Sequence, residues 1–185
     1  MKTYFANASM GILSLLLLGF GSACTSLNFD RLPGTEQGRI PWNLRGTYYI
    51  DEDKKKQERM QVLVGEYNMI WSGTAAHDSD CCDTMTLNKD FRLHELPGKM
   101  YCMGNTDTLE NGMAVWNITV IKDRGRRLEV YPLNAGKALE QHLSHYLNTR
   151  DSGIMKTYVM DDARFYEFCS RKLKRAQAGY LMRMP

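Results

Sequence analysis

The sequence predicts a mainly β fold (β+α), in which an antiparallel meander forms a small barrel or sandwich and one or two α-helices follow toward the C-terminus. Three observations support this class. Short runs of β-branched and aromatic residues alternate with turn signals between residues 44 and 133. After residue 134 the apolar spacing changes from two residues to three or four, which is typical of amphipathic helices. The length of 185 residues fits one domain with extensions.

The expected strands are rich in Val, Ile, Thr, Tyr and Trp and end at Gly, Pro or charged residues. They cover 44–50, 60–73, 83–96, 100–104, 112–123 and 126–133. The run at 112–123 is the strongest strand signal, and Arg124–Gly125 supplies a tight turn after it. This regular spacing of strands and turns favours a single β-rich domain over 42–185.

Two helices are predicted near 135–149 and 161–177. The first has Leu139, Leu143 and Leu147 at positions i, i+4 and i+8, which places the three leucines on one face. The second begins with aspartates and ends in cations, and both features suit the helix dipole. The segment 154–160 between them fits one more strand.

The first 23 residues have the pattern of a secretory signal peptide. Lys2 gives a positive start, Ile12–Phe20 is an apolar run, and small residues follow at Gly21–Ala23. The apolar run is too short to cross a bilayer of about 30 Å, which needs roughly 20 apolar residues. We therefore expect 1–23 to be removed and the rest of the chain to be exported.

Cys24 directly follows these small residues, and the stretch resembles the lipobox of bacterial lipoproteins. Gly21 stands where that pattern usually has Leu. The resemblance implies lipidation: diacylglycerol on the Cys24 sulfur and a fatty acid such as palmitate on the new amino terminus. Several acyl chains together hold a protein stably on a membrane, whereas one chain does not. The alternative is an ordinary signal peptide cut nearby, with Cys24 free.

Residues 24–41 are expected to form a flexible tether, because Ser, Asn, Gly and Pro interrupt any periodicity there. Thr25 and Ser26 follow the cysteine, and neither is aspartate. By similarity to the enterobacterial sorting rule, this implies the outer membrane. The expected location is the bacterial cell envelope, with the domain in the periplasm and a lipid anchor in the membrane.

The stretch "RGTYYI" is similar to the first-strand Gly-x-Trp signature of the calycin or lipocalin family. Tyr48 stands where that family has Trp, and Trp42 lies four residues before Gly46 instead of two after it. Together with the meander and the C-terminal helix, the resemblance implies a barrel whose interior holds a small ligand.

Four cysteines remain when Cys24 is set aside: Cys81, Cys82, Cys102 and Cys169. Four cysteines allow three connectivities. A bond between the adjacent Cys81 and Cys82 would be strained, so we expect each to pair with Cys102 or Cys169, because an exported chain meets an oxidising environment. Free buried thiols are the alternative. Adjacent cysteines in a strand point to opposite faces, and no Cys-x-x-Cys occurs, so no metal site is expected.

His142 and His145 lie at i and i+3 on the first expected helix, on the side away from the leucines, and are expected to be surface residues. Basic residues outnumber acidic ones between Arg164 and Arg183, where Glu167 is the one acidic residue. This basic stretch fits a solvated helix face or a patch for anionic lipid or a partner. The net charge of +3 is too small to indicate nucleic-acid binding.

Two tripeptides, Asp83-Thr84-Met85 and Asp107-Thr108-Leu109, are similar to the Asp-Ser/Thr-aliphatic O-glycosylation signal of Bacteroidetes-type exported proteins. The resemblance implies sugars on Thr84 and Thr108. Asn117–Thr119 also forms a glycosylation sequon, but it lies in the middle of an expected strand.

The sequence therefore favours a non-catalytic, membrane-anchored envelope lipoprotein whose β-rich domain binds a small apolar ligand or an envelope partner. The alternative is a structural accessory subunit of a membrane-associated assembly that docks through its basic C-terminal helix. A thiol-dependent enzyme or hydrolase is the third class, and the sequence has neither a nucleophile motif nor a phosphate-binding loop for it. No catalytic residue, cofactor or metal ligand is expected.

Overall fold

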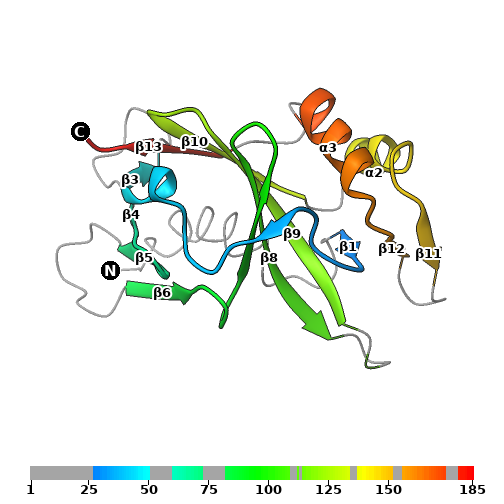
Figure 1. The fold of residues 1–185 in the computed structure, drawn as a ribbon, viewed down its shortest axis with the longest axis horizontal. Helices are drawn as coiled ribbons and strands as arrows, with labels where there is room; N and C mark the ends of the chain where they lie inside the picture. The colour runs from blue at the N-terminus through cyan, green and yellow to red at the C-terminus, as the bar shows by residue number, and fades with distance from the viewer. Residues whose placement is uncertain are drawn as a thin grey trace, which may run out of the picture.

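The structure is a computed structural model that describes residues 27–50, 60–72, 82–108, 112, 114–133, 137–151, 156–173 and 179–185. It confirms the predicted fold class, because a curled antiparallel sheet forms a half-barrel with two short α-helices at one end (Figure 1). The strands are β1 (Asn28–Phe29), β2 (Thr35–Glu36), β3 (Gly46–Ile50), β4 (Gln61–Val64), β5 (Asn68–Ser72), β6 (Cys82–Thr86), β7 (Arg92–Leu96), β8 (Met100–Thr108), β9 (Ala114–Asp123), β10 (Arg127–Pro132), β11 (Thr149–Asp151), β12 (Lys156–Tyr158) and β13 (Gly179–Arg183). The helices are the 3-10 helix η1 (Trp42–Leu44), α2 (Lys137–Leu143) and α3 (Asp162–Arg171).

The meander pairs each strand with its neighbour in sequence from β3 to β6 and from β7 to β10. The C-terminal strand β13 lies between β10 and β3 and joins these two halves. Beyond β9 the sheet continues through β1 and β12 to β11. β13 was not among the expected strands, although it completes the curl of the sheet.

The two faces of the curled sheet have separate cores, because side chains alternate along each strand. In β8, Tyr101 and Met103 belong to the inner core, which lies inside the curl. Cys102 between them belongs to the helix-side core, which α2 and α3 cover. Large side chains such as Tyr48 fill the inner core, and Phe165 of α3 is fully buried in the helix-side core.

Arg183 fastens β13 to β3 at one end of the inner core. Its guanidinium lies over the ring of Tyr48, 5.3 Å from the ring centre, and Nη2 donates to the Tyr48 hydroxyl at 2.6 Å. The same nitrogen donates to the carbonyl oxygen of Asn43. The Tyr48 hydroxyl in turn donates to the carbonyl oxygen of Leu44 at 2.8 Å. Burial raises the pKa of Tyr48, although Arg183 opposes this shift, so the hydroxyl remains a donor at neutral pH.

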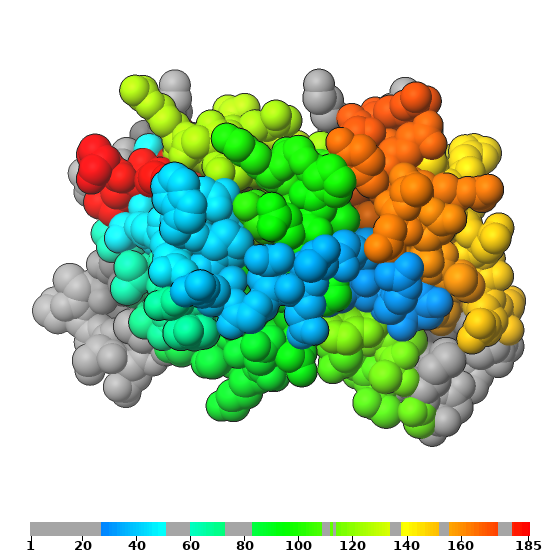
Figure 2. All heavy atoms as spheres, viewed as in Figure 1, coloured from blue at the N-terminus to red at the C-terminus, as the bar shows by residue number. Residues whose placement is uncertain are grey.

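The N-terminal segment 27–40, here called the strap, is part of the fold. Leu27, Phe29 and Ile40 are buried, and β2 within the strap pairs with β7. Figure 2 shows the strap in blue, extending across one face of the molecule from the yellow and orange helices toward the other end. The flexible tether expected over 24–41 is therefore wrong for residues 27–41. The Gly and Pro residues that suggested it mark turns within a segment whose apolar residues pack on the sheet.

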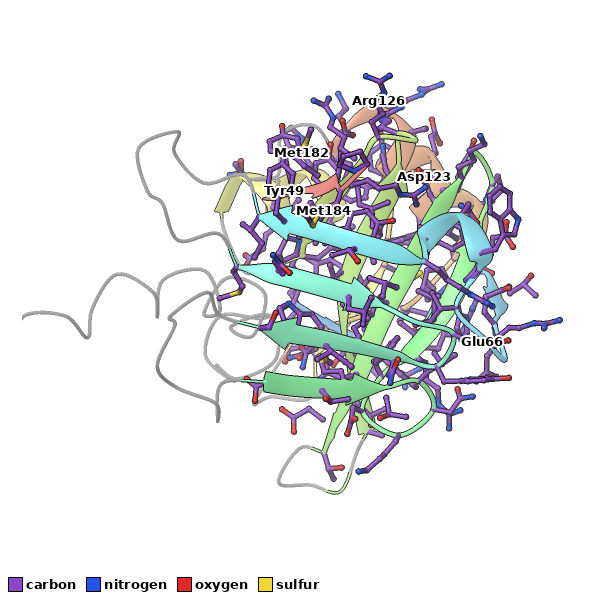
Figure 3. All side chains as sticks on the ribbon, turned by 90° about the vertical axis from the view of Figure 1, so that its left-hand side faces the viewer. Tyr49, Glu66, Asp123, Arg126, Met182 and Met184 are labelled. Atoms are coloured by element: carbon purple, nitrogen blue, oxygen red, sulfur yellow. The ribbon has the colours of Figure 1, made fainter. Side chains whose placement is uncertain are left out.

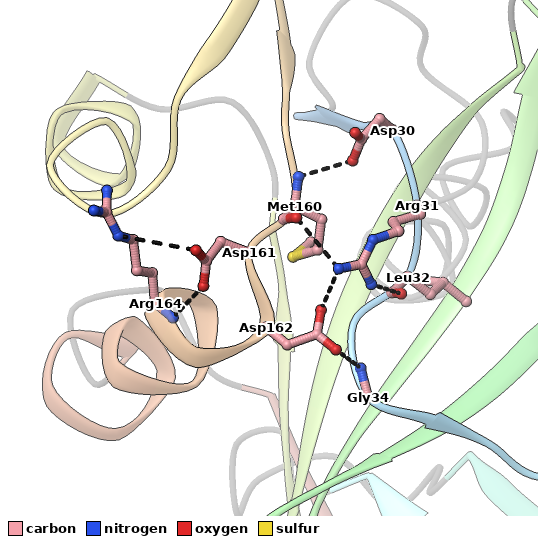
Figure 4. Close-up of polar contacts among 8 residues, drawn as sticks. All are labelled: Asp30, Arg31, Leu32, Gly34, Met160, Asp161, Asp162 and Arg164. Carbon is pink, nitrogen blue, oxygen red and sulfur yellow. Dashed lines mark hydrogen bonds and ion pairs between the residues drawn. The ribbon is translucent and has the colours of Figure 1, made fainter.

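Polar contacts tie the strap to the start of α3 (Figure 4). Asp162 forms an ion pair with Arg31 at 2.7 Å, and its other carboxylate oxygen accepts from the backbone N–H of Gly34 at 3.1 Å. The carboxylate of Asp30 accepts from the backbone N–H of Met160 at 2.8 Å. Gly34 has φ of 86°, and a Cβ there would lie 2.3 Å from the carbonyl oxygen of Glu95, so this close crossing requires glycine.

Both predicted helices exist, but each is shorter than expected. Asp161 caps α3 by accepting from the backbone N–H of Arg164 at 3.0 Å, as the acidic start of this segment predicts. The three leucines of the first expected helix point inward: Leu143 and Leu147 are buried, and Leu139 packs against the same core. Within the residues that the structure describes, no helix is long and apolar enough to span a bilayer.

Candidate functional site

Two open grooves flank α2, and both are lined by His142 and His145. The larger, here called the helical groove, has a volume of about 690 Å³ and is lined by His142, His145, Tyr146, Arg164, Glu167 and Lys172. The second has a volume of about 580 Å³ and is lined by Glu140, Gln141, His142, Ser144, His145 and Lys156. The shared histidines make the two grooves neighbouring parts of one surface.

The apolar sides of the two helices determine which residues line the helical groove. Leu143 on α2 and Phe165 and Phe168 on α3 are buried in the helix-side core. The polar sides of both helices are consequently left at the surface. Tyr146 packs edge-on against Phe168, with ring centres 5.8 Å apart, so the wall of the groove rests on the core.

Cations outnumber anions in the lining of the helical groove. Arg164 lies 4.0 Å from Asp161, a long separation between largely exposed side chains, so this ion pair is weak. Glu167 is the one acidic residue in the lining, and it forms an ion pair with Arg171 at 2.9 Å. Lys172 adds a second cation. This arrangement is suited to an anion.

The second groove adds Lys156 to this surface. Its ammonium nitrogen lies 3.3 Å from the Ser144 hydroxyl and 5.3 Å from the centre of the Tyr158 ring. Both contacts leave an ammonium group with donors to spare, because it has three N–H bonds. Lys156 therefore extends the positive character of the surface from α3 to the edge of β12.

A second surface with functional potential is the outer side of the half-barrel, formed by β13, β3, β4 and β5. The residues of this uncovered sheet face are Tyr49, Leu63, Ile70, Met182 and Met184. Tyr49 and Met182 are cross-strand neighbours, as are Leu63 and Ile70. Leu63 is 47% exposed and Met184 is 41% exposed. Figure 3 shows Tyr49, Met182 and Met184 close together on this side, where no described helix covers the strands.

Glu129 of β10 is buried and lies at the centre of a cluster of charged and polar side chains. Its carboxylate accepts from Arg124 at 3.1 Å, from Arg127 at 3.0 Å and from the Tyr131 hydroxyl at 3.0 Å. Burial acts to raise the pKa of Glu129, but these hydrogen bonds together hold it below its usual value. Burial and the bond to Glu129 raise the pKa of Tyr131 to about 12. These contacts join side chains of the same hairpin, so the cluster stabilises the fold.

Cys102 and Cys169 are free, buried thiols, which corrects the expectation that each is bonded to Cys81 or Cys82. Cys102 points into the helix-side core, whereas β6, which carries Cys82, pairs with β5 at the far edge of the sheet. Burial raises the pKa of Cys102 well above its usual value and that of Cys169 to about 12. Both thiols therefore stay protonated and unreactive at neutral pH.

Other predicted site residues lie outside the described part of the chain: Cys24, Cys81 and the side chain of Cys82. Thr84 on β6 and Thr108 at the end of β8 are exposed, and their glycosylation stays a prediction. In the part of the chain that the structure describes, no three His, Cys, Asp or Glu residues come together to hold a metal ion.

The two histidines and the basic stretch are separate features of the sequence, and the structure brings them together. Lys156 was not predicted as a site residue, because it lies in the expected strand 154–160 and belongs to no ligand motif, and the uncovered sheet face was not predicted either. The alternation of residues 61–64 was the available signal for that face, since Leu63 is the outward residue between the buried Val62 and Val64.

Comparisons of the chain with protein-family models, with curated proteins and with solved structures found no match.

Proposed function

We propose that this protein is a non-catalytic lipoprotein of the bacterial envelope that binds an envelope protein through its uncovered sheet face. The observation that carries this proposal is the position of that face. In Figure 1, β13, β3, β4 and β5 lie at one end of the long axis, while β1 and the two helices lie at the other. The chain enters the fold at β1, which begins four residues after Cys24, so an anchor there would leave the uncovered sheet face pointing away from its attachment.

A protein partner is favoured over a small apolar ligand. The calycin resemblance implies a ligand pocket inside the barrel, but the inner core is occupied by the strands' own side chains, among them Tyr48, Trp71 and Tyr101. Leu63 and Met184 are instead exposed on the outer side, and with the half-buried Ile70 they would be covered by a partner.

A thiol-dependent enzyme is not favoured, because the two cysteines with described side chains are buried and have raised pKa values. The accessory-subunit alternative also describes a protein that docks on other proteins at the membrane. It differs in the docking element, since it uses the basic C-terminal helix. Arg171 of α3 is already engaged by Glu167 at 2.9 Å, so less of the positive charge of this helix is available to a protein partner.

The lipid anchor is tested with Cys24→Ala. Cells that express the wild type or the variant are labelled with a radioactive fatty acid, and their membranes are fractionated. The wild type should carry label and sediment with the outer membrane, and the variant should lose both properties. Unchanged labelling and unchanged membrane retention in the variant would contradict the anchor.

The partner surface is tested by placing a photoreactive phenylalanine analogue at position 63 in living cells. Position 106 is the control, since Thr106 is also exposed on a strand but lies on β8. Position 63 should give one crosslinked product of defined mass, which is lost when Met184→Glu is added, and position 106 should give none. The same products from both positions, or none from position 63, would contradict this surface.

A further inference from the structure

The distance between the anchor and the fold is short. Only Thr25 and Ser26 separate Cys24 from Leu27, which is buried and donates its backbone N–H to the carbonyl oxygen of Leu133 at 3.3 Å. An extended residue spans at most about 3.6 Å, so Cys24 lies within roughly 11 Å of Leu27. An anchor at Cys24, which is part of the proposed function, would hold this end of the domain at the membrane surface.

The chain enters the fold beside the surface that carries the two grooves. β1 runs parallel to β12, with Asn28 opposite Thr157, so Leu27 and Lys156 are the residues that precede this pair. Lys156 lines the second groove. Leu133, which accepts the hydrogen bond from Leu27, is followed four residues later by the start of α2. The elements beside the entry of the chain therefore include β12, which carries Lys156 of the second groove, as well as β9.

We propose that the helical groove binds the phosphate of anionic phospholipid headgroups in the membrane that holds the Cys24 anchor. Arg164 and Lys172 are the principal ligands, and Lys156 contributes from the side on which the chain enters. A guanidinium matches phosphate with two parallel N–H donors, and ammonium groups add point charges. A negatively charged membrane surface attracts basic residues held within a Debye length of it.

The acidic residues beside the helical groove do not cancel this preference, and Glu140 lines the second groove and not the helical one. Glu167 is engaged by Arg171 at 2.9 Å, and Asp161 is engaged by the backbone N–H of Arg164 that it caps. The imidazoles of His142 and His145 supply further N–H donors at the centre of the surface. The competing explanation, a solvated helix face without a ligand, predicts no preference among headgroups.

The test uses the purified full-length protein in neutral dodecyl maltoside micelles, where binding does not depend on whether Cys24 carries lipid. Short-chain phosphatidylglycerol, phosphatidylcholine and inorganic phosphate are titrated separately and followed by calorimetry at low salt. The groove variant is Arg164→Gln with Lys172→Gln. The matched control is Lys89→Gln with Arg126→Gln, which removes the same charge from exposed turn residues elsewhere.

Phosphatidylglycerol should bind at least about tenfold more tightly than phosphatidylcholine, and the affinity should fall with salt. The groove variant should lose about tenfold in affinity, and the control should stay within about twofold of the wild type. Equal binding of the two lipids, equal loss in both variants, or inorganic phosphate binding as tightly as phosphatidylglycerol would each overturn the proposal. Unchanged labelling and membrane retention in Cys24→Ala cells, together with phosphatidylglycerol binding in micelles, would contradict the anchor of the proposed function and leave the groove proposal standing.

Discussion

Replacing Leu32 by alanine measures how firmly the strap belongs to the fold. Leu32 is 4% exposed in the helix-side core, and it lies against Gly104 of β8, where an added Cβ would be 2.4 Å from its Cδ2 atom. Leu→Ala changes at such buried positions cost roughly 2–5 kcal/mol of unfolding free energy, because the transfer free energy is lost and a cavity remains. We expect a loss of about 3 kcal/mol, which lowers Tm by about 6–12 °C for a protein of this size.

Thermal unfolding followed by circular dichroism provides the measurement. The matched control is Leu63→Ala, the same change at a side chain that is 47% exposed, and it should lower Tm by less than about 2 °C. A flexible tether would make the two variants behave alike. A decrease of less than about 2 °C for Leu32→Ala would therefore refute the packing of the strap.

A second change separates packing from a general effect of the substitution. Gly104→Ala should destabilise the wild type by about 1–3 kcal/mol, because its Cβ must displace Leu32. In the Leu32→Ala background the same change should cost less, since the nearest clashing atom is gone. The carbonyl oxygen of Asn117, 3.1 Å from the added Cβ, keeps part of the cost. Additive effects of the two changes would show that Leu32 does not lie against Gly104.

Three further predictions concern buried titratable groups. The pKa of Tyr131 is about 12 in the folded protein against 10.0 in the unfolded chain, so the contribution of this group to the unfolding free energy is fully present below pH 10 and falls by up to about 2.7 kcal/mol as the pH rises through 12. Tyr131→Phe should flatten this decline in urea unfolding at high pH. The pKa of Glu129 is lowered by folding, so its contribution to the unfolding free energy is present above pH 4.5, its unfolded pKa, and is lost as the pH falls through the folded pKa. Glu129→Gln should cost about 1–3 kcal/mol of unfolding free energy at pH 7 and weaken the loss of stability in acid, and an unchanged loss in acid would contradict the cluster. Cys102 and Cys169 should react with a thiol reagent in urea but not in the native protein, and their resistance to the reagent in urea would show that they are bonded after all.

The elements that the sequence predicted are those specified by local patterns. The expected strand at 112–123 corresponds to β9, Ala114–Asp123, because a long run of β-branched and aromatic residues is followed by a turn at Gly125. The start of α3 was predicted from Asp161, whose capping bond involves residues three positions apart. Such signals need no knowledge of distant parts of the chain.

The strap and β13 could not be predicted in this way, because their partners are distant in sequence. Asn28 pairs with Asn117 and Thr157, and the strap has the Gly and Pro content of a loop. β13 lies between β10 and β3 and is fixed by Arg183 on Tyr48, a pair separated by 135 residues. Neither segment has an apolar period of its own, so only the assembled sheet makes these positions favourable.

The cysteine pairing was wrong for a related reason. An even number of cysteines and an oxidising location indicate how many disulfide bonds can form, but they do not indicate which way each cysteine side chain points. In β8 the register places Cys102 on the helix side, and Tyr101 and Met103 point into the inner core. A shift of one residue would have turned Cys102 into the inner core instead. The side chain's direction thus depends on a pairing that the sequence analysis could not assign.

Asp162 connects the two parts of the molecule on which the functional proposals depend. Its carboxylate holds Arg31 and the backbone of Gly34 in the strap, and its own backbone begins α3, which carries Arg164. Arg31 also donates to the carbonyl oxygen of Met160, just before the helix. The chain that leads to Cys24 and the helix that lines the groove are therefore one packed unit. A flexible tether would let the groove rotate freely relative to the proposed anchor at Cys24, whereas this packing would allow such an anchor to orient the domain.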